Sequence, residues 1–272
     1  MRPVDKRTKI GLGIGAAAGA TILISWLASK TLESRIKAAQ SPPSYRVQGP
    51  KVSIVIPSLE EENYLPQLLT TVANQTYYPI ESVVADSSPD PSRKETEDIC
   101  RHFGARYVYV PKLNVSLARN EGARFASGEI LVFTDADCCF APDYIEQAVA
   151  ALESGYVLAH GADPTLGGGL WDTVTALARC GLKPSHWTSG RGIAIRRDTF
   201  WGLGGYNEAL DPTLGYREDL DLGWRVAAAY GAERMKYFTT PMISESPRRL
   251  QMGIVNSWLS TRGVRNGKVI PV

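Results

Sequence analysis

The chain has 272 residues, which is enough for one sizeable globular domain and a flanking segment. Hydrophobic residues make up 44% and charged residues 21% of it, an ordinary balance for a globular protein. The net charge of +2 provides no basic excess, which argues against a general nucleic-acid binder. None of the four cysteines stands in a C-x-x-C pair, so a structural zinc site is not expected. Cys138 and Cys139 are adjacent, which does not suit a simple disulfide framework and favours a reducing compartment.

The first fifty residues are predicted to lie outside the globular fold. Residues 10–29 contain no charge and, as a helix rising about 1.5 Å per residue, would just cross a bilayer core of about 30 Å. We therefore expect a single-pass membrane anchor over residues 1–30 and a linker over 31–50. A cleaved signal peptide is the alternative, but the uncharged run is long for one and is most apolar at its far end.

A stripe of glycines runs along this predicted span. Gly11, Gly15 and Gly19 would lie on one face of a helix and would let a second copy approach closely, giving a homo-oligomer. The competing explanation is that glycine is simply common in membrane spans. The flanking charges are nearly balanced, so they predict no orientation.

Downstream, apolar runs alternate with segments of helical periodicity. The first half predicts strands at 52–56, 82–85, 107–110 and 129–133 and helices at 65–72, 92–103, 116–126 and 142–152. Ser116 is the expected N-cap of the third helix. The second half predicts a strand at 190–196, a glycine-rich turn at 202–206 and a helix at 218–230. This alternation predicts an α/β fold with a mostly parallel sheet covered by helices on both faces.

Polar residues follow three of these strands. They are the segment after Pro57, Asp86, and the pair Asp135 and Asp137. Because open α/β sheets bind ligands at the carboxyl ends of their strands, this edge is the expected site. A carboxylate at Asp86 suits a ribose or a base, although Asp also favours turns for local reasons.

The triplet Asp135-Ala136-Asp137 is a candidate metal site. Two carboxylates beyond one strand can meet a hard cation such as Mg²⁺ or Mn²⁺, which prefers oxygen ligands and keeps substrate phosphates as partners. Such a cation would neutralise charge on a departing diphosphate. The alternative is a polar loop or a cap of the next helix.

Three further groups could take part in chemistry. Glu218 and Asp219 precede a helix, where a carboxylate could remove a proton from an acceptor or could simply stabilise the helix end. Arg119, Arg248 and Arg249 could bind phosphate oxygens, or they could be surface cations.

In combination, four motifs resemble those of family 2 glycosyltransferases with the GT-A fold. They occur in the family's order at residues 55–62 (VIPSLEEE), 83–88 (VVADSS), 118–137 (ARNEGARFASGEILVFTDAD) and 195–225, which contains IRRDTF, GGYNE and REDLDLGWR. The resemblance covers residues 51 to about 249. It implies a GT-A domain at 51–250, with a nucleotide-sugar half at 51–160, an acceptor half at 161–250 and a tail at 251–272.

The resemblance also implies roles for individual residues. The donor would be a nucleotide-diphospho-sugar, and the transfer would invert the sugar's configuration. The residues implied to contact the donor are Pro57, Leu59, Glu61, Asp86, Arg119, Asp135, Ala136, Arg248 and Arg249. Asp137, helped by Asp135, would hold the divalent cation, and Asp219, with Glu218 beside it, would be the general base.

Two departures from the family pattern refine this expectation. Glu60 replaces the usual Asn of the first motif, and no Q-x-x-R-W motif follows the Glu218-Asp219 pair, which favours a single transfer over polymer synthesis. A membrane anchor suggests a lipid-linked or glycan acceptor, with residues 161–187 as the acceptor loop. We expect the catalytic domain to face the cytosol, where nucleotide sugars are supplied.

Two other functions compete with this one. A degenerate member could keep the fold and the anchor yet only bind a sugar or a partner, but it would not need to retain both Asp137 and Asp219. A nucleotidyltransferase would carry a glycine- and lysine-rich phosphate signature after its first strand, where this chain has Glu60-Glu61-Glu62.

Overall fold

The computed structural model describes residues 37–161, 190–210 and 218–238, together with Ser34, Thr188 and the backbone of residues 243–245, 264–265 and 268–269. The predicted membrane span and the glycine stripe lie outside these residues. Within the part that is described, no helix has the length and apolar character needed to cross a bilayer.

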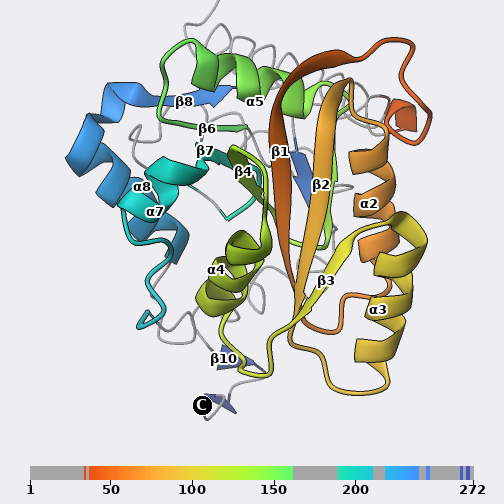
Figure 1. Cartoon of the computed structure of the whole chain (residues 1–272). Helices are drawn as coiled ribbons and strands as arrows, with labels where there is room; N and C mark the ends of the chain where they lie inside the picture. The colour runs from red at the N-terminus through yellow and green to blue at the C-terminus, as the bar shows by residue number, and fades with distance from the viewer. Residues whose placement is uncertain are drawn as a thin grey trace, which may run out of the picture.

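A seven-stranded sheet forms the centre of the molecule, in the order β3-β2-β1-β4-β7-β6-β8 (Figure 1). The strands are β1 (Val47–Ser58), β2 (Tyr77–Asp86), β3 (Arg106–Tyr109), β4 (Ile130–Phe133), β6 (Leu158–Gly161), β7 (Ile193–Arg196) and β8 (Met235–Phe238). β1 to β4 are mutually parallel, and β7 is antiparallel to both β4 and β6. The prediction of a mostly parallel α/β sheet is therefore confirmed.

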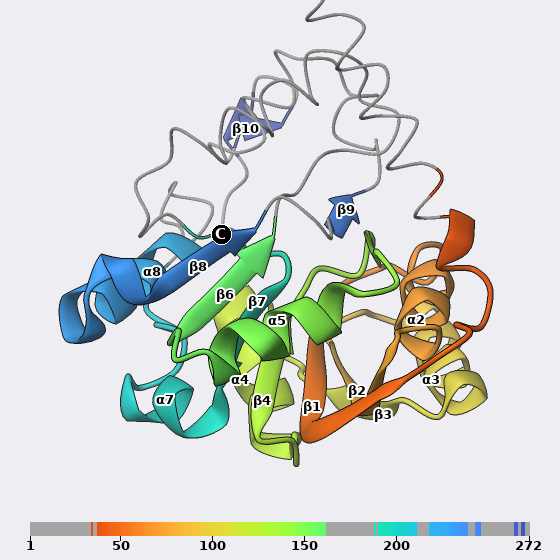
Figure 2. The same ribbon diagram turned by 90° about the horizontal axis from the view of Figure 1, so that it is seen from above.

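Seven helices that have both ends among the described residues accompany this sheet. Six are α-helical: α2 (Leu65–Ala73), α3 (Ser92–Phe103), α4 (Val115–Phe125), α5 (Tyr144–Glu153), α7 (Arg197–Gly202) and α8 (Glu218–Tyr230); the seventh, η2 (Ala232–Arg234), is a short 3-10 turn. Figure 1 shows α2 and α3 on one side of the sheet and α4 on the other. Seen from above in Figure 2, β6 and β8 lie side by side beyond β7.

The alternation of side chains along the strands divides the core in two. On β1, Ile54 and Ile56 face a cluster with α2, α3 and α5, whereas Val55 faces a cluster with α4, α7 and α8. All three side chains are fully buried. Because this strand is buried on both faces, apolar residues occupy successive positions, which explains the continuous apolar run in the sequence.

Several predicted boundaries were wrong. β1 begins at Val47, inside the predicted linker, because it pairs with β2 from Val47 opposite Tyr77 and continues past an irregularity after Gln48. The N-cap of α4 is Asn114 rather than Ser116, since the Asn114 side chain accepts a hydrogen bond from Leu117 N at 2.9 Å. Ser116 lies one position inside the helix and is fully buried.

The short strand β5 (Cys138–Phe140) was not predicted. It pairs with β9 (Ile243–Glu245) in a separate two-stranded sheet directly after the Asp135-Ala136-Asp137 triplet. A further hairpin joins β10 (Val264–Arg265) to β11 (Lys268–Val269). The pairing of β5 with β9 ties the chain after the acidic triplet to a segment about a hundred residues away.

Candidate active site

The carboxyl ends of β1, β2 and β4 lie at one edge of the sheet. Ser58 is in register with Asp86, and Val55 is in register with Phe133, two residues before Asp135. The loops beyond β1 and β2 are joined by hydrogen bonds from Ser87 N to Ser58 O at 2.9 Å and from Glu60 N to the Ser88 hydroxyl at 2.8 Å. The sheet order thus brings the predicted polar segments to one edge.

Asp86 is fully buried at the end of β2 and its two carboxylate oxygens have separate partners. Oδ1 accepts a hydrogen bond from the Ser88 hydroxyl at 2.6 Å, and Oδ2 accepts one from the Tyr107 hydroxyl at 3.1 Å. Burial and the nearby Asp86 charge raise the pKa of Tyr107, so this phenol remains a donor. These contacts orient the Asp86 carboxylate.

Three of the other residues predicted to contact a donor lie at the end of β1 or on the loop after it. Pro57 and Glu61 are half-buried, and Leu59 is exposed on the loop that follows β1. Ser58, also at the end of β1, was missed by the sequence reasoning. Its buried hydroxyl has no hydrogen-bond partner among the described residues. A buried polar atom of this kind calls for an explanation such as a bound water or a ligand.

The acidic triplet leaves β4 and enters β5. Ala136 is buried, the Asp137 residue is 8% exposed and the Asp135 side chain is 33% exposed. Burial, and then the charges of Asp135 and Asp137, raise the pKa of the neighbouring Cys138 thiol well above its ordinary value. Cys138 is therefore neutral beside the two carboxylates.

Arg119 joins the two halves of the site. This side chain of α4 is only 3% exposed, and its Nη2 donates to Asp135 Oδ1 at 2.8 Å while its Nη1 donates to Glu218 Oε1. Burial opposes the charge of Arg119, but Glu218 and Asp135 hold its pKa above the ordinary value. The sequence reasoning expected Arg119 to contact phosphate, whereas the structure places its guanidinium between two carboxylates.

Glu218 and Asp219 are the first two residues of α8, and both are buried. Asp219 Oδ2 accepts a hydrogen bond from Gly190 N, and Oδ1 accepts one from Leu220 N, each at 2.8 Å. The Thr188 hydroxyl donates to the Asp219 carbonyl. Backbone donors therefore fix the orientation of the Asp219 carboxylate.

Gly190 contributes in two ways that the sequence reasoning missed. Its N–H binds Asp219, and a Cβ at this position would lie 2.5 Å from Arg119 Nη2. The only sequence signal was its place at the start of a predicted strand, which says nothing about a neighbour in α4.

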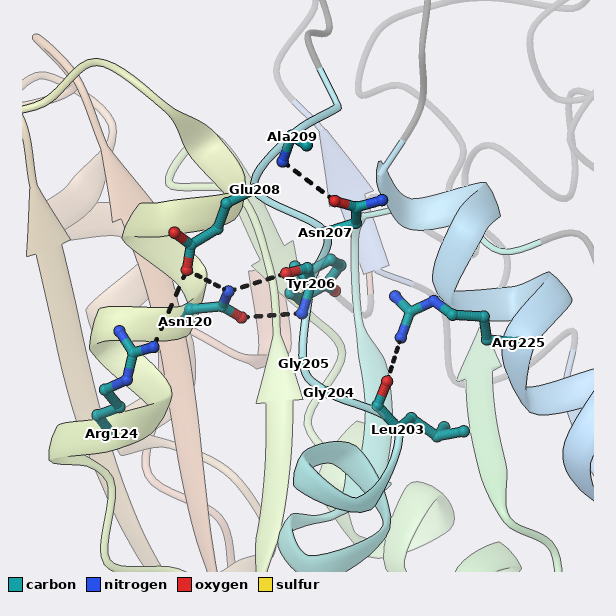
Figure 3. A pocket seen from close by; sticks show the side chains of 10 residues that line it. All are labelled: Asn120, Arg124, Leu203, Gly204, Gly205, Tyr206, Asn207, Glu208, Ala209 and Arg225. Carbon is teal, nitrogen blue, oxygen red and sulfur yellow. Dashed lines mark hydrogen bonds and ion pairs between the residues drawn. The ribbon is translucent and has the colours of Figure 1, made fainter.

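A polar pocket of about 440 Å³ lies beside this cluster (Figure 3). Asn120 holds the turn at Gly204-Gly205 through its side-chain amide, which accepts from Tyr206 N and donates to Tyr206 O, each at 2.9 Å. The amide nitrogen also donates to Glu208 Oε1 at 2.7 Å. Both glycines have positive φ values, 85° and 72°, which explains the glycine pair at this turn.

Some predicted residues cannot be placed in the site. Arg248, Arg249 and the acceptor segment from 162 to 187 lie outside the described residues. Within the described ranges, no group of three or more His, Cys, Asp or Glu side chains is arranged to hold a metal ion. The described cysteines, Cys100, Cys138 and Cys139, are buried free thiols.

Comparison with known proteins identifies the family. The model of "Glycosyl transferase family 2" matches residues 53–204, more than half of the chain. Validoxylamine A glucosyltransferase of Streptomyces hygroscopicus subsp. limoneus is 30% identical over 224 residues, which cover 66% of this chain and 48% of that protein. The chain thus spans about half the length of this relative.

Solved structures show the same fold. The mannosyltransferase PcManGT from Pyrobaculum calidifontis, in complex with GDP-Man and Mn²⁺, superposes with a TM-score of 0.61 at 22% identity, covering 91% of this chain and 72% of that one. S. aureus TarS 1-349 in complex with UDP-GlcNAc gives a TM-score of 0.56 at 17% identity, covering 72% and 58%. With its GT-A-like sheet and the family match over residues 53–204, the chain belongs to glycosyl transferase family 2.

Proposed function

We propose that this protein transfers a single sugar from a nucleotide-diphospho-sugar to an acceptor hydroxyl, with inversion at the anomeric carbon. The observation that carries the proposal is the Arg119 contact that links Asp135, beyond β4, to Glu218, which opens α8. This contact would hold the residues proposed to bind the donor beside those proposed to act as base, at the carboxyl edge of the sheet where α/β folds bind ligands.

The donor's nucleoside would lie over the ends of β1 and β2. Asp86 has a fixed, buried carboxylate there that can accept hydrogen bonds from a ribose or a base. Pro57 lies near the end of β1, Leu59 and Glu61 lie on the loop that follows it, and Ala136 is next to Asp135 on the other side. Arg248 and Arg249 remain proposed contacts of the diphosphate.

The residues present fit a divalent cation. Mg²⁺ in nucleotide sites commonly takes one or two protein carboxylates and fills its other positions with substrate phosphates and water. Asp137 and Asp135 supply carboxylate oxygens of this kind, and Asp137 is the principal ligand we propose, as the resemblance to the family implies; one oxygen of Asp135 binds Arg119. When bound, the cation would offset negative charge on the leaving diphosphate.

Asp219 is the proposed general base. In a single displacement, the base must lie across the sugar from the leaving group, and Asp219 comes from the half of the chain that does not carry Asp137. Backbone N–H groups bind Oδ2 and Oδ1 of Asp219, and a carboxylate held in this way can take up the proton of the acceptor hydroxyl. The hydrogen bonds that fix the carboxylate would pre-align it for that transfer.

The acceptor and the cellular setting are proposed from the sequence alone. We propose a lipid-linked or glycan acceptor, a single-pass anchor over residues 1–30, a catalytic domain in the cytosol and self-association through Gly11, Gly15 and Gly19. The uncharged run at residues 10–29 and the glycine spacing support these proposals.

A donor screen tests the proposed function. The full chain would be incubated in detergent with UDP-glucose, UDP-GlcNAc or GDP-mannose, membrane lipid extract and MnCl₂, and the release of nucleoside diphosphate would be measured. We expect release that EDTA abolishes and that Asp137→Ala lowers at least about a hundredfold. Asp98→Ala is the matched control, because this aspartate is 70% exposed on α3.

Two outcomes would contradict the proposal. Release that survives both EDTA and Asp137→Ala would remove the cation from the mechanism. No release with any donor, combined with binding of the same nucleotides, would favour a non-catalytic sugar-binding protein.

A further inference from the structure

Arg119 occupies an enclosed position that does not suit a contact with a ligand. Its side chain is 3% exposed, and both terminal nitrogens of the guanidinium already bind carboxylates. A guanidinium is a rigid planar fork that can hold two acceptors at fixed positions. In this chain the two acceptors, Asp135 and Glu218, come from opposite halves of the proposed site.

The surroundings of Arg119 hold it in place. The Tyr206 ring centre lies 5.3 Å from the guanidinium carbon, within the range of a cation–π contact. At Gly190, a Cβ would lie 2.5 Å from Nη2, so the missing side chain makes room for the guanidinium. The N–H of the same glycine binds Asp219 at 2.8 Å, which connects the placement of Arg119 to that of the proposed base.

The Tyr206 ring is itself fixed from α4. Asn120, the residue next to Arg119, binds both the N–H and the carbonyl of Tyr206, as Figure 3 shows. The ring packs edge-on against Phe133, the last residue of β4, with centroids 5.0 Å apart. Arg119 and Asn120, which are adjacent on α4, thus place the Arg119 guanidinium and the Tyr206 ring against each other.

We infer that Arg119 is a positioning residue that sets the placement of Asp135 relative to the Glu218–Asp219 pair, and that it does not bind the donor's diphosphate. This inference rests on the proposed function. Misplacing a reacting group by a small distance slows a transfer strongly even where the substrate still binds. Loss of the Arg119 geometry therefore lowers kcat far more than donor affinity, because Asp137 and not Asp135 is the principal proposed ligand of the cation.

Arg119→Lys is the first test, because lysine keeps the charge but has one ammonium group that cannot bridge two carboxylates in the same way. With the best of the three donors and MnCl₂, we expect kcat for nucleoside diphosphate release to fall at least about tenfold, with donor KM changed less than about threefold. Binding of UDP or GDP with MnCl₂, measured by calorimetry, is expected to stay within about threefold.

Gly190→Ala is the second variant, since it retains every charged group and crowds Nη2 of Arg119. It is expected to show the same loss of kcat with retained donor affinity. Arg101→Lys is the control: this arginine of α3 is 69% exposed, pairs with Glu97 and Asp98 and is expected to behave as wild type.

Three results would overturn the inference. A tenfold or greater rise in donor KM and loss of nucleotide affinity, with kcat kept, would make Arg119 a phosphate contact. Wild-type kinetics in both Arg119→Lys and Gly190→Ala would show that Arg119 has no part in positioning the site, and the proposed function would still stand. A wild-type protein with no turnover on any donor would remove the proposed function together with this inference.

Discussion

Replacing Asp219 by asparagine separates the chemical role of this residue from its structural role. The variant keeps the shape of the side chain but exchanges one acceptor oxygen for an amide group that only donates. Both oxygens of Asp219 accept backbone N–H groups, from Gly190 and Leu220. Whichever way the amide is turned, either the buried N–H of Gly190 or the partly buried N–H of Leu220 therefore loses its acceptor.

The structure gives two magnitudes for Asp219→Asn. A buried N–H left without a partner costs about 1–3 kcal/mol, so the free energy of unfolding should fall by that amount. Loss of a general base costs about 10²- to 10⁴-fold in turnover, equivalent to about 3–5 kcal/mol in the barrier. The loss of activity should therefore exceed what partial unfolding can explain.

The assay combines urea denaturation with initial rates of nucleoside diphosphate release, both at one temperature. Asp221→Asn is the control, because this aspartate lies on the same helix and pairs with Arg225 at a partly exposed position. Donor binding by Asp219→Asn should match wild type. Wild-type turnover in Asp219→Asn would refute the base assignment, and so would a loss of turnover fully accounted for by lost donor binding.

Three further predictions concern stability and reactivity. Gly122→Ala should lower the free energy of unfolding by about 1–3 kcal/mol, because the new Cβ would lie 2.5 Å from Val55 Cγ1; urea denaturation measures it. Burial and the Asp137 charge raise the pKa of Cys139 to about 12, so this thiol should resist a thiol reagent at pH 8 until urea unfolds the chain. Burial opposes the charge of Glu81, yet the hydrogen bond from Lys51 leads the interactions that lower its pKa to about 2. The contribution of Glu81 to the free energy of unfolding is then present above about pH 4.5 and lost as the pH falls towards 2. Glu81→Gln should remove this pH-dependent contribution, which is on the order of 1–2 kcal/mol after solvent screening. Urea denaturation at several pH values measures it.

Local sequence patterns predicted most elements correctly. The helices at 92–103 and 218–230 have the predicted bounds, since apolar periodicity and acidic first turns are properties of the segment itself. The extension of β1 back to Val47 was missed because it depends on pairing with β2. Strand β5 was missed because three residues carry too little pattern of their own.

What the sequence by itself determined is the alternation of strands and helices as far as α5, with β5 as the exception, and with it the edge of the sheet at which Asp86 and the Asp135-Ala136-Asp137 triplet lie. That follows because parallel strands joined by helices end at a common edge. Only the tertiary structure determined which side chains of the site contact one another. The contact of Arg119 with Glu218, for example, joins residues 99 positions apart in the chain. No local pattern encodes such a contact, because it exists only once β4, α4 and α8 are packed together.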